Sequence, residues 1–103
     1  MKGMEKRTAH YNLIDVKTIV LKRGMDAFTK TAKNNARLMG LDGQAALDVV
    51  LGLQRGMLFK SMTTHTSSQV WQDVYHAPCP CGQIAYIKVT MQAGATVIQF
   101  KEK

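Results

Sequence analysis

The sequence has no hydrophobic run that approaches the roughly 20 apolar residues of a membrane-spanning helix. Its start, MKGMEKRTAHYN, lacks the apolar core of a secretory signal peptide. It also lacks internal repeats and low-complexity linkers. These absences argue against a membrane protein, a secreted protein and a repeat protein. We therefore expect one cytoplasmic domain over residues 1–103, with no membrane partner.

Cysteine is scarce, with only Cys79 and Cys81 in the chain. They lie two residues apart, which is too close for a comfortable structural disulfide, and in a reducing compartment we expect them to be thiols. Zinc binding is the alternative, with His76 as a third ligand. Structural zinc generally has four protein ligands, and no fourth is evident. We therefore expect no metal and no cofactor.

Several catalytic signatures are also missing. There is no Ser/His/Asp pattern, no glycine-rich phosphate loop and no pair of carboxylates. Acidic residues are few, and the 14 Lys and Arg against seven Asp and Glu give a net charge of +7 and a pI near 9.7. Residues 1–37 hold nine basic and three acidic residues, or +6. Such a charge favours nucleic acid, an anionic membrane or an acidic protein as partner. A solvated surface rich in lysine is the alternative.

The first half of the chain has helical periodicity. Asn12 is a candidate N-cap for a helix that ends at Gly24. A second helix is expected at 29–39. A third follows Asp42 as N-cap, and because it is apolar on nearly all sides, we expect it to be the central buried helix.

From Gly56 the period changes to two, which predicts antiparallel strands joined by short connections. In the first of them Phe59 should point to one face and Lys60 to the other. The remaining strands are expected at 70–76, 83–92 and 96–101, with a turn at 77–82. The order of elements predicts an α+β fold in which the helices cover one face of the sheet and leave the other partly open.

Four polar side chains are expected on that open face: Lys60, Gln72, Tyr86 and Lys88. Neighbouring strands lie about 5 Å apart, so side chains from three strands can meet around one phosphate. RNA cleavage needs a base for the 2′-hydroxyl, an acid for the leaving oxygen, and positive charge beside the phosphorane. Lysine, tyrosine and an amide suit parts of that task. An ordinary solvated sheet face is the alternative.

Histidine and aromatic residues add candidates. His65 and His76 flank the proposed site and titrate near neutral pH, so they rank above His10, although a lone surface histidine often has no role. Trp71 and Tyr75 share one strand face. Stacking on bases is one interpretation, and core packing is the one we prefer.

Three motifs resemble the family of motility quorum-sensing regulator toxins, MqsR: FKSMTTHTSSQVWQDVY at 59–75, AYIKVT at 85–90 and FKEK at 100–103. The resemblance implies a fold similar to the RelE and YoeB ribonucleases, with a curved antiparallel sheet and about three helices. It implies an endoribonuclease that cuts single-stranded mRNA, without the ribosome, at GC-containing sites such as GCU. It also implies a cognate antitoxin that binds the toxin and contacts operator DNA for both.

In that resemblance the family's active-site residues fall on Lys60, Gln72 and Tyr86. Here His65 and His76 replace a tyrosine and an arginine that are common in the family. Loss of the arginine's permanent charge is expected to weaken phosphate binding or to make it depend on pH. The further residues expected to contact RNA are Met62, His65, His76 and Lys88.

Two other functions remain open. One is a non-catalytic regulator that binds nucleic acid through the same basic surface, and the other is a protein-interaction module whose basic first half docks an acidic partner. Cleaved RNA ends would separate the first from a nuclease, and the second predicts no affinity for RNA.

Overall fold

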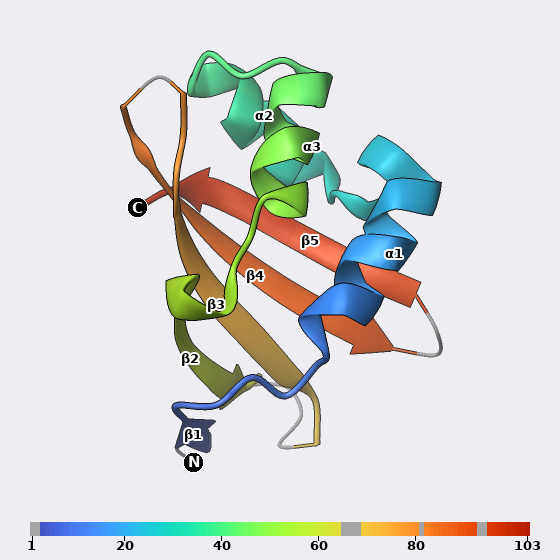
Figure 1. Ribbon diagram of the computed structural model, residues 1–103, viewed down its shortest axis with the longest axis vertical. Helices are drawn as coiled ribbons and strands as arrows, with labels where there is room; N and C mark the ends of the chain where they lie inside the picture. Colours follow the sequence, from blue (N-terminus) through green and yellow to red (C-terminus); the bar gives the residue numbers. More distant parts are fainter. Residues whose placement is uncertain (1–2, 65–68, 81, 93–94) are drawn as a thin grey trace.

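A computed structural model describes residues 3–64, 69–80, 82–92 and 95–103. Its helices and strands are α1 (Leu13–Arg23), α2 (Lys30–Leu38), α3 (Gly43–Leu51), β1 (Glu5–Lys6), β2 (Leu58–Thr63), β3 (Trp71–Pro78), β4 (Ile84–Gln92) and β5 (Ala95–Glu102), with short 3-10 turns at Gly24–Ala27 and Arg55–Met57. The strands form one antiparallel sheet in the order β1-β2-β3-β4-β5. The predicted α+β fold, with three helices and a curved antiparallel sheet, is confirmed (Figure 1).

The helices begin where polar side chains cap them. Asn12, Thr29 and Asp42 each accept a hydrogen bond from the backbone N–H three residues further on. These bonds satisfy donors that a helix start otherwise leaves unpaired. Gly24 ends α1 with a φ of 58°, a conformation that glycine adopts without steric cost. The predicted caps at Asn12 and Asp42 are therefore confirmed.

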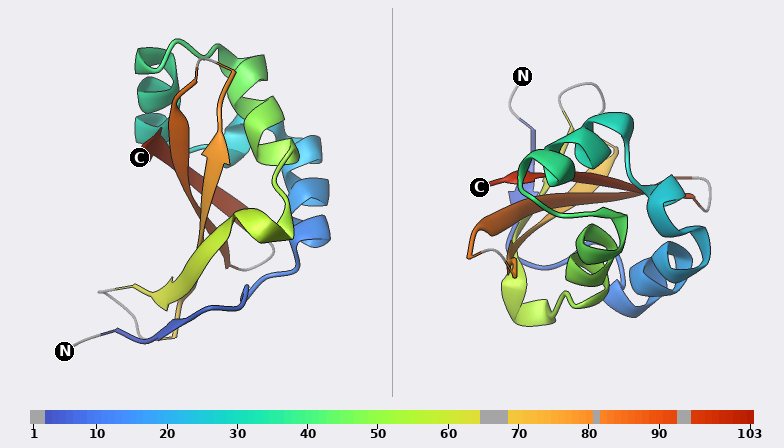
Figure 2. Two further views of the ribbon diagram at one scale, coloured as in Figure 1. Left: turned by 60° about the vertical axis from the view of Figure 1, so that its left-hand side comes forward. Right: turned by 90° about the horizontal axis from the view of Figure 1, so that it is seen from above.

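The helices divide between one face of the sheet and one edge. α1 and α3 lie together on the core face, whereas α2 runs along β5 (Figure 2). The backbone of Phe28 and Thr29 pairs with Ile98, which covers part of the edge of β5. No helix in the described part of the chain is long and apolar enough to cross a membrane.

α3 is less enclosed than its composition predicts. Only Ala46 and Val50 within it are buried, while Leu47 and Leu51 are partly exposed. The predicted central position agrees with the packing of α3 against both α1 and α2, but the helix is only partly buried, because the core is shared by all three helices and the sheet. Its largest fully buried side chains include Tyr75, Phe100, Leu53, Ile87 and Ile98.

A β-bulge in β2 changes the direction of one predicted side chain. Leu58 pairs with Tyr75 and Lys60 pairs with Val74, so Phe59 is an extra residue between consecutive positions of β3. A bulge of this kind turns two successive side chains to the same face. Phe59 therefore points to the open face beside Lys60, and the prediction from simple alternation was wrong at this residue.

The N-terminal segment, in which no strand was predicted, forms β1 and is tied to β3. Asp73 is buried and accepts hydrogen bonds from the backbone N–H groups of His10 and Tyr11, at 2.9 to 3.1 Å. The Tyr11 hydroxyl donates to the Trp71 carbonyl at 2.7 Å. Because β1 is only two residues long, these contacts hold the segment more firmly than its two ladder positions do.

Trp71 and Tyr75 lie on one face of β3, as predicted, but in different surroundings. Tyr75 is buried in the core. The Trp71 ring stacks on His10 with a centroid distance of 5.3 Å, and the Lys6 ammonium lies 4.3 Å from its centre. Core packing is thus confirmed for Tyr75, whereas Trp71 packs under the N-terminal segment.

Candidate active site

The open face of the sheet presents three rows of side chains, each running across neighbouring strands. The aromatic row consists of Phe59, His76, Tyr86 and Lys101. The lysine row consists of Lys60, Val74, Lys88 and Gln99. The amide row consists of Glu5, Met62, Gln72 and Thr90.

The lysine row gathers positive charge at the centre of the face. Val74 lies between Lys60 and Lys88 and is fully buried, although it points away from the helices. Long lysine side chains cover apolar surface in this way while their ammonium groups stay near solvent. Burial lowers the pKa of Lys88, and the charges of Lys101 and Lys60 lower it further. Crowded cations of this kind form a binding site for an anion such as phosphate.

Glu5 is the counter-ion of Lys60. The ammonium donates to a carboxylate oxygen at 2.6 Å, and the Lys60 side chain is 20% exposed, compared with 57% for Glu5. Glu5 lies opposite Met62 in the amide row, so its side chain reaches diagonally to the neighbouring row. Because Glu5 is exposed and Lys60 is partly exposed, the pair is weakened by solvent, and a substrate phosphate can compete for the lysine.

The aromatic row is a stack of rings. Phe59 and His76 lie 4.5 Å apart at 20°, and His76 and Tyr86 lie 5.5 Å apart. The Nε2 atom of His76 is buried and has no hydrogen-bond partner in the described part of the chain. Burial, with a smaller effect from the charge of Lys103, lowers the pKa of His76. The imidazole is therefore neutral near pH 7, and its Nε2 is not placed to accept a proton from a substrate.

Gln72 and Tyr86 lie on opposite sides of the lysine row. The Gln72 amide donates to the Thr90 hydroxyl at 3.4 Å, and Thr90 is four residues from Tyr86 along β4. Four residues of strand span about 13 Å. At this distance the two side chains cannot contact the same phosphate, and Lys60 lies between them. They suit contacts to successive parts of an RNA strand.

Two comparisons with known proteins bear on this site. Residues 8–102 match the family described as motility quorum-sensing regulator, toxin of MqsA. The chain is 40% identical over 100 residues to a protein of Escherichia coli (strain K12) named mRNA interferase toxin MqsR, an alignment that covers 97% of this chain and 100% of the relative. The chain belongs to the MqsR toxin family. The family resemblance seen in its motifs is thereby confirmed.

All three residues matched to the active site of the MqsR family, Lys60, Gln72 and Tyr86, lie on the open face. Met62 lies between Glu5 and Gln72 and is half-buried. Their roles remain predictions. His65, expected to contact RNA, lies outside the described residues.

The zinc hypothesis has little geometric support. Cys79 is buried in the core cluster, His76 points to the open face, and Cys81 lies outside the described residues. No group of three or more His, Cys, Asp or Glu side chains suited to a metal occurs in the described part of the chain.

Sequence reasoning missed several members of the face, among them Glu5, Phe59 and Lys101. Lys101 lies in the family motif FKEK and follows the alternation of β5, with its ammonium 5.0 Å from the centre of the Tyr86 ring. That alternation could have placed it beside Tyr86. Glu5 and Phe59 had no such indication, because one depends on a two-residue strand and the other on a bulge.

Proposed function

We propose that this chain is an endoribonuclease that cuts mRNA without the ribosome, with the open face of the sheet as its active site. The observation that supports it most strongly is the 40% identity, over the full length of the relative, to a protein named mRNA interferase toxin. The lysine row supports the same conclusion, because Lys60 and Lys88 flank Val74 and could both contact one phosphate. We further propose that residues 1–103 act as one toxin domain.

The proposed reaction is a transesterification that uses no metal. The 2′-oxygen forms a bond to the adjacent phosphorus, and the bond from phosphorus to the 5′-oxygen breaks. The products are a 2′,3′-cyclic phosphate and a 5′-hydroxyl. The 2′-hydroxyl loses its proton to solvent, and the leaving 5′-oxygen gains one from the enzyme, so charge and protons balance.

Lys60 is proposed to stabilise the negative charge that develops on the phosphorane. It becomes available when the phosphate displaces Glu5. Tyr86 is proposed as the proton donor to the leaving oxygen, and the Lys101 ammonium lies 5.0 Å from the centre of its ring. Gln72 is proposed to hold the ribose or phosphate of the neighbouring nucleotide. Catalysis then depends mainly on positioning and charge.

The partners follow from the family. We propose that a cognate antitoxin neutralises the chain, that the pair reaches operator DNA through the antitoxin and represses its own operon, and that GC-containing sequences such as GCU are cut. Because mRNA is the substrate, the site of action is the cytoplasm. Co-expression with the antitoxin should relieve growth arrest and yield a stable complex of the two proteins.

Cleavage of purified RNA tests the proposal directly. Wild-type protein, in EDTA and without ribosomes, is expected to produce fragments with 2′,3′-cyclic phosphate ends. Lys60→Ala should lower the rate by at least about a hundredfold, because it removes a charge that contacts the transition state. Circular dichroism should show that the variant is folded, since Lys60 is not part of the core.

Lys22→Ala is the matched control. Lys22 lies in the last turn of α1, on the opposite side of the sheet. The variant protein should therefore cut RNA at the wild-type rate. A folded Lys60→Ala protein that cuts as fast as wild type would place the active site elsewhere. RNA binding without cleavage by the wild type would favour a non-catalytic regulator instead, and a strict metal requirement would contradict the proposed chemistry.

A further inference from the structure

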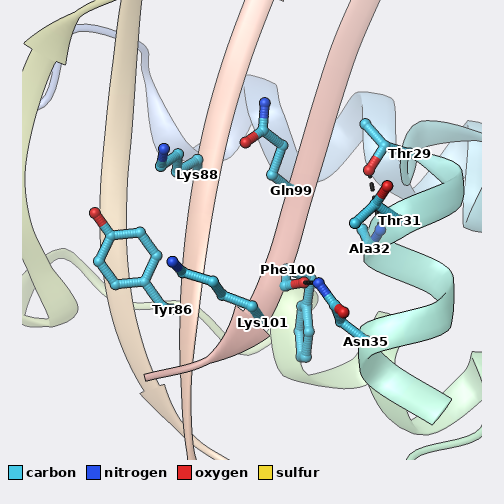
Figure 3. A pocket seen from close by; sticks show the side chains of 9 residues that line it. All are labelled: Thr29, Thr31, Ala32, Asn35, Tyr86, Lys88, Gln99, Phe100 and Lys101. Atoms are coloured by element: carbon cyan, nitrogen blue, oxygen red, sulfur yellow. Dashed lines mark hydrogen bonds between the residues drawn. The ribbon is translucent and has the colours of Figure 1, made fainter. Parts of the chain in front are cut away.

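A pocket of about 360 Å³ lies where α2 borders the open face of the sheet (Figure 3). One wall is formed by the first two turns of α2 and its cap, and the other by β4 and β5. The pocket shares Tyr86, Lys88, Gln99 and Lys101 with the open face of the sheet. It is therefore continuous with the place where the RNA backbone would lie, but the family motif at 59–75 does not contribute to it.

The polar groups of the pocket differ in how far they are already engaged. The Thr29 hydroxyl accepts from the Ala32 N–H, and the Asn35 amide donates to the Phe100 carbonyl. By contrast, the exposed side chains of Thr31 and Gln99 make no hydrogen bond within the described part of the chain. One hydroxyl and one amide on opposite walls of the pocket are therefore available to form hydrogen bonds with a ligand.

The remaining surface suits a flat, uncharged ring attached to a phosphate. Tyr86 presents its ring at one end, with the Lys101 and Lys88 ammonium groups 5.0 and 6.0 Å from the ring centre. The volume is near the lower end of the range for small-ligand pockets, about 300 Å³, which suits one nucleobase and not a folded RNA. Proteins recognise unpaired bases in RNA by stacking on aromatic rings and by hydrogen bonds to the base edges.

We propose that this pocket binds one nucleobase of the RNA substrate, next to the scissile phosphate, and that Gln99 and Thr31 distinguish that base by hydrogen bonds to its edge. Lys88 and Lys101 hold the phosphates on either side of the bound nucleotide. This inference rests on the proposed nuclease function, and it identifies where part of the sequence preference is set.

Cleavage of short RNAs that differ near the cut site tests the proposed base-binding pocket. A panel of short RNAs shares one cleavage site and differs in a single flanking base, and kcat/KM is measured for each. Gln99→Leu keeps the bulk of the side chain but loses the amide. In this variant the kcat/KM for the preferred base, divided by that for the other bases, should fall by at least about fivefold. The change should occur at one flanking position only. Thr31→Val should lower the ratio at the same position.

Gln54→Leu is the matched control, because Gln54 is exposed and lies between α3 and the next 3-10 turn, outside the pocket lining. Its ratios should equal those of the wild type. Unchanged ratios in both Gln99→Leu and Thr31→Val would overturn the base-binding pocket, while cleavage that still depends on Lys60 would leave the nuclease function intact. Absence of RNA cleavage by the wild type would instead remove the proposed function itself.

Binding without cleavage gives an independent result. An RNA carrying 2-aminopurine at each position in turn is mixed with Lys60→Ala protein. Stacking on Tyr86 should quench the fluorescence at the same flanking position that the ratios identify, and Gln99→Leu in that background should weaken binding there. Equal quenching at all positions, or tight binding of free nucleoside monophosphates with no preference among RNAs, would contradict a base-specific subsite.

Discussion

Glu5 and Lys60 lie 55 residues apart in the chain, and their side chains form an ion pair of 2.6 Å. The pair joins β1 to the lysine row and occupies the ammonium that the proposed reaction needs. An RNA phosphate must therefore displace a carboxylate before Lys60 can contact it. This relationship makes Glu5 a competitor of the substrate.

Glu5→Gln removes the competing charge and keeps the shape of the side chain. An ion pair with one exposed partner, as Glu5 is here, contributes about 1 kcal/mol, so we expect the Kd for RNA to fall by about fivefold. The kcat should stay near the wild-type value. Binding of a non-cleavable RNA with a 2′-deoxy linkage at the cut site measures the first quantity, and single-turnover cleavage measures the second.

Loss of kcat would give a different role to Glu5. If Glu5→Gln lowers kcat by a hundredfold or more and removes the acidic limb of the pH–rate profile, the carboxylate accepts the 2′-hydroxyl proton, and solvent does not. Asp15→Asn, on the exposed first turn of α1, controls for a simple change in net charge.

Asp73 is conspicuous within the WQDVY motif, and its contacts assign it a structural role. Asp73→Ala removes the acceptor for the backbone N–H groups of His10 and Tyr11 and leaves these partly buried donors unpaired. We expect the free energy of unfolding to fall by about 2–3 kcal/mol. Asp73→Asn, which retains one acceptor oxygen, should lose less.

Urea denaturation measures this loss, and Asp48→Ala is the control, because Asp48 is exposed on α3 and should change stability by less than about 0.5 kcal/mol. Fluorescence gives a second result. Trp71, the single tryptophan, should become more exposed in Asp73→Ala as His10 and Lys6 leave its ring. A stable Asp73→Ala protein that is nonetheless inactive would show that Asp73 acts in catalysis.

Local patterns in the sequence were enough to predict the helices and most strands. Asn12 and Asp42 cap helices through contacts to residues only three positions away, so short-range spacing contains the information. The alternation in β4 likewise placed Tyr86 and Lys88 on one face, as the pairing with β3 confirms.

What the sequence did not predict depends on contacts between distant segments. The bulge at Phe59 is set by how Leu58 and Lys60 align with β3, which alternation within β2 does not reveal. β1 has only two residues, and the buried carboxylate of Asp73 holds the backbone of His10 and Tyr11 after it, so no periodicity indicates this strand. For that reason the ion pair of Glu5 could not be predicted before the fold was known.

His76 makes stability depend on pH. Its pKa is lowered by burial and by the charge of Lys103, so below its usual value of 6.5 the unfolded chain takes up the proton more readily than the folded protein does. Stability should therefore be highest above pH 6.5 and fall as the pH drops toward the lowered pKa. The thermal midpoint measured from pH 8 to pH 5 should show this decline.

His76→Phe keeps a ring between Phe59 and Tyr86 but cannot titrate, and it should reduce the decline. His10→Phe, at the exposed histidine that stacks on Trp71, is measured alongside so that the decline caused by His76 is separated from any caused by His10. An unchanged slope in His76→Phe would mean that other groups produce the pH dependence.

The cations of the open face should be visible in the salt dependence of RNA binding. Each lysine that neutralises a phosphate releases a counterion from the RNA, and for a single strand the slope of log K against log salt changes by about 0.7 for each phosphate so neutralised. Lys88→Ala and Lys101→Ala should each reduce the slope by roughly that amount, whereas Lys22→Ala on α1 should not. Loss of a lysine that only adds to the overall charge of +7 would change the slope by much less. If all three variants retain the wild-type slope, the RNA backbone does not cross the lysine row, and the path proposed for the substrate is wrong.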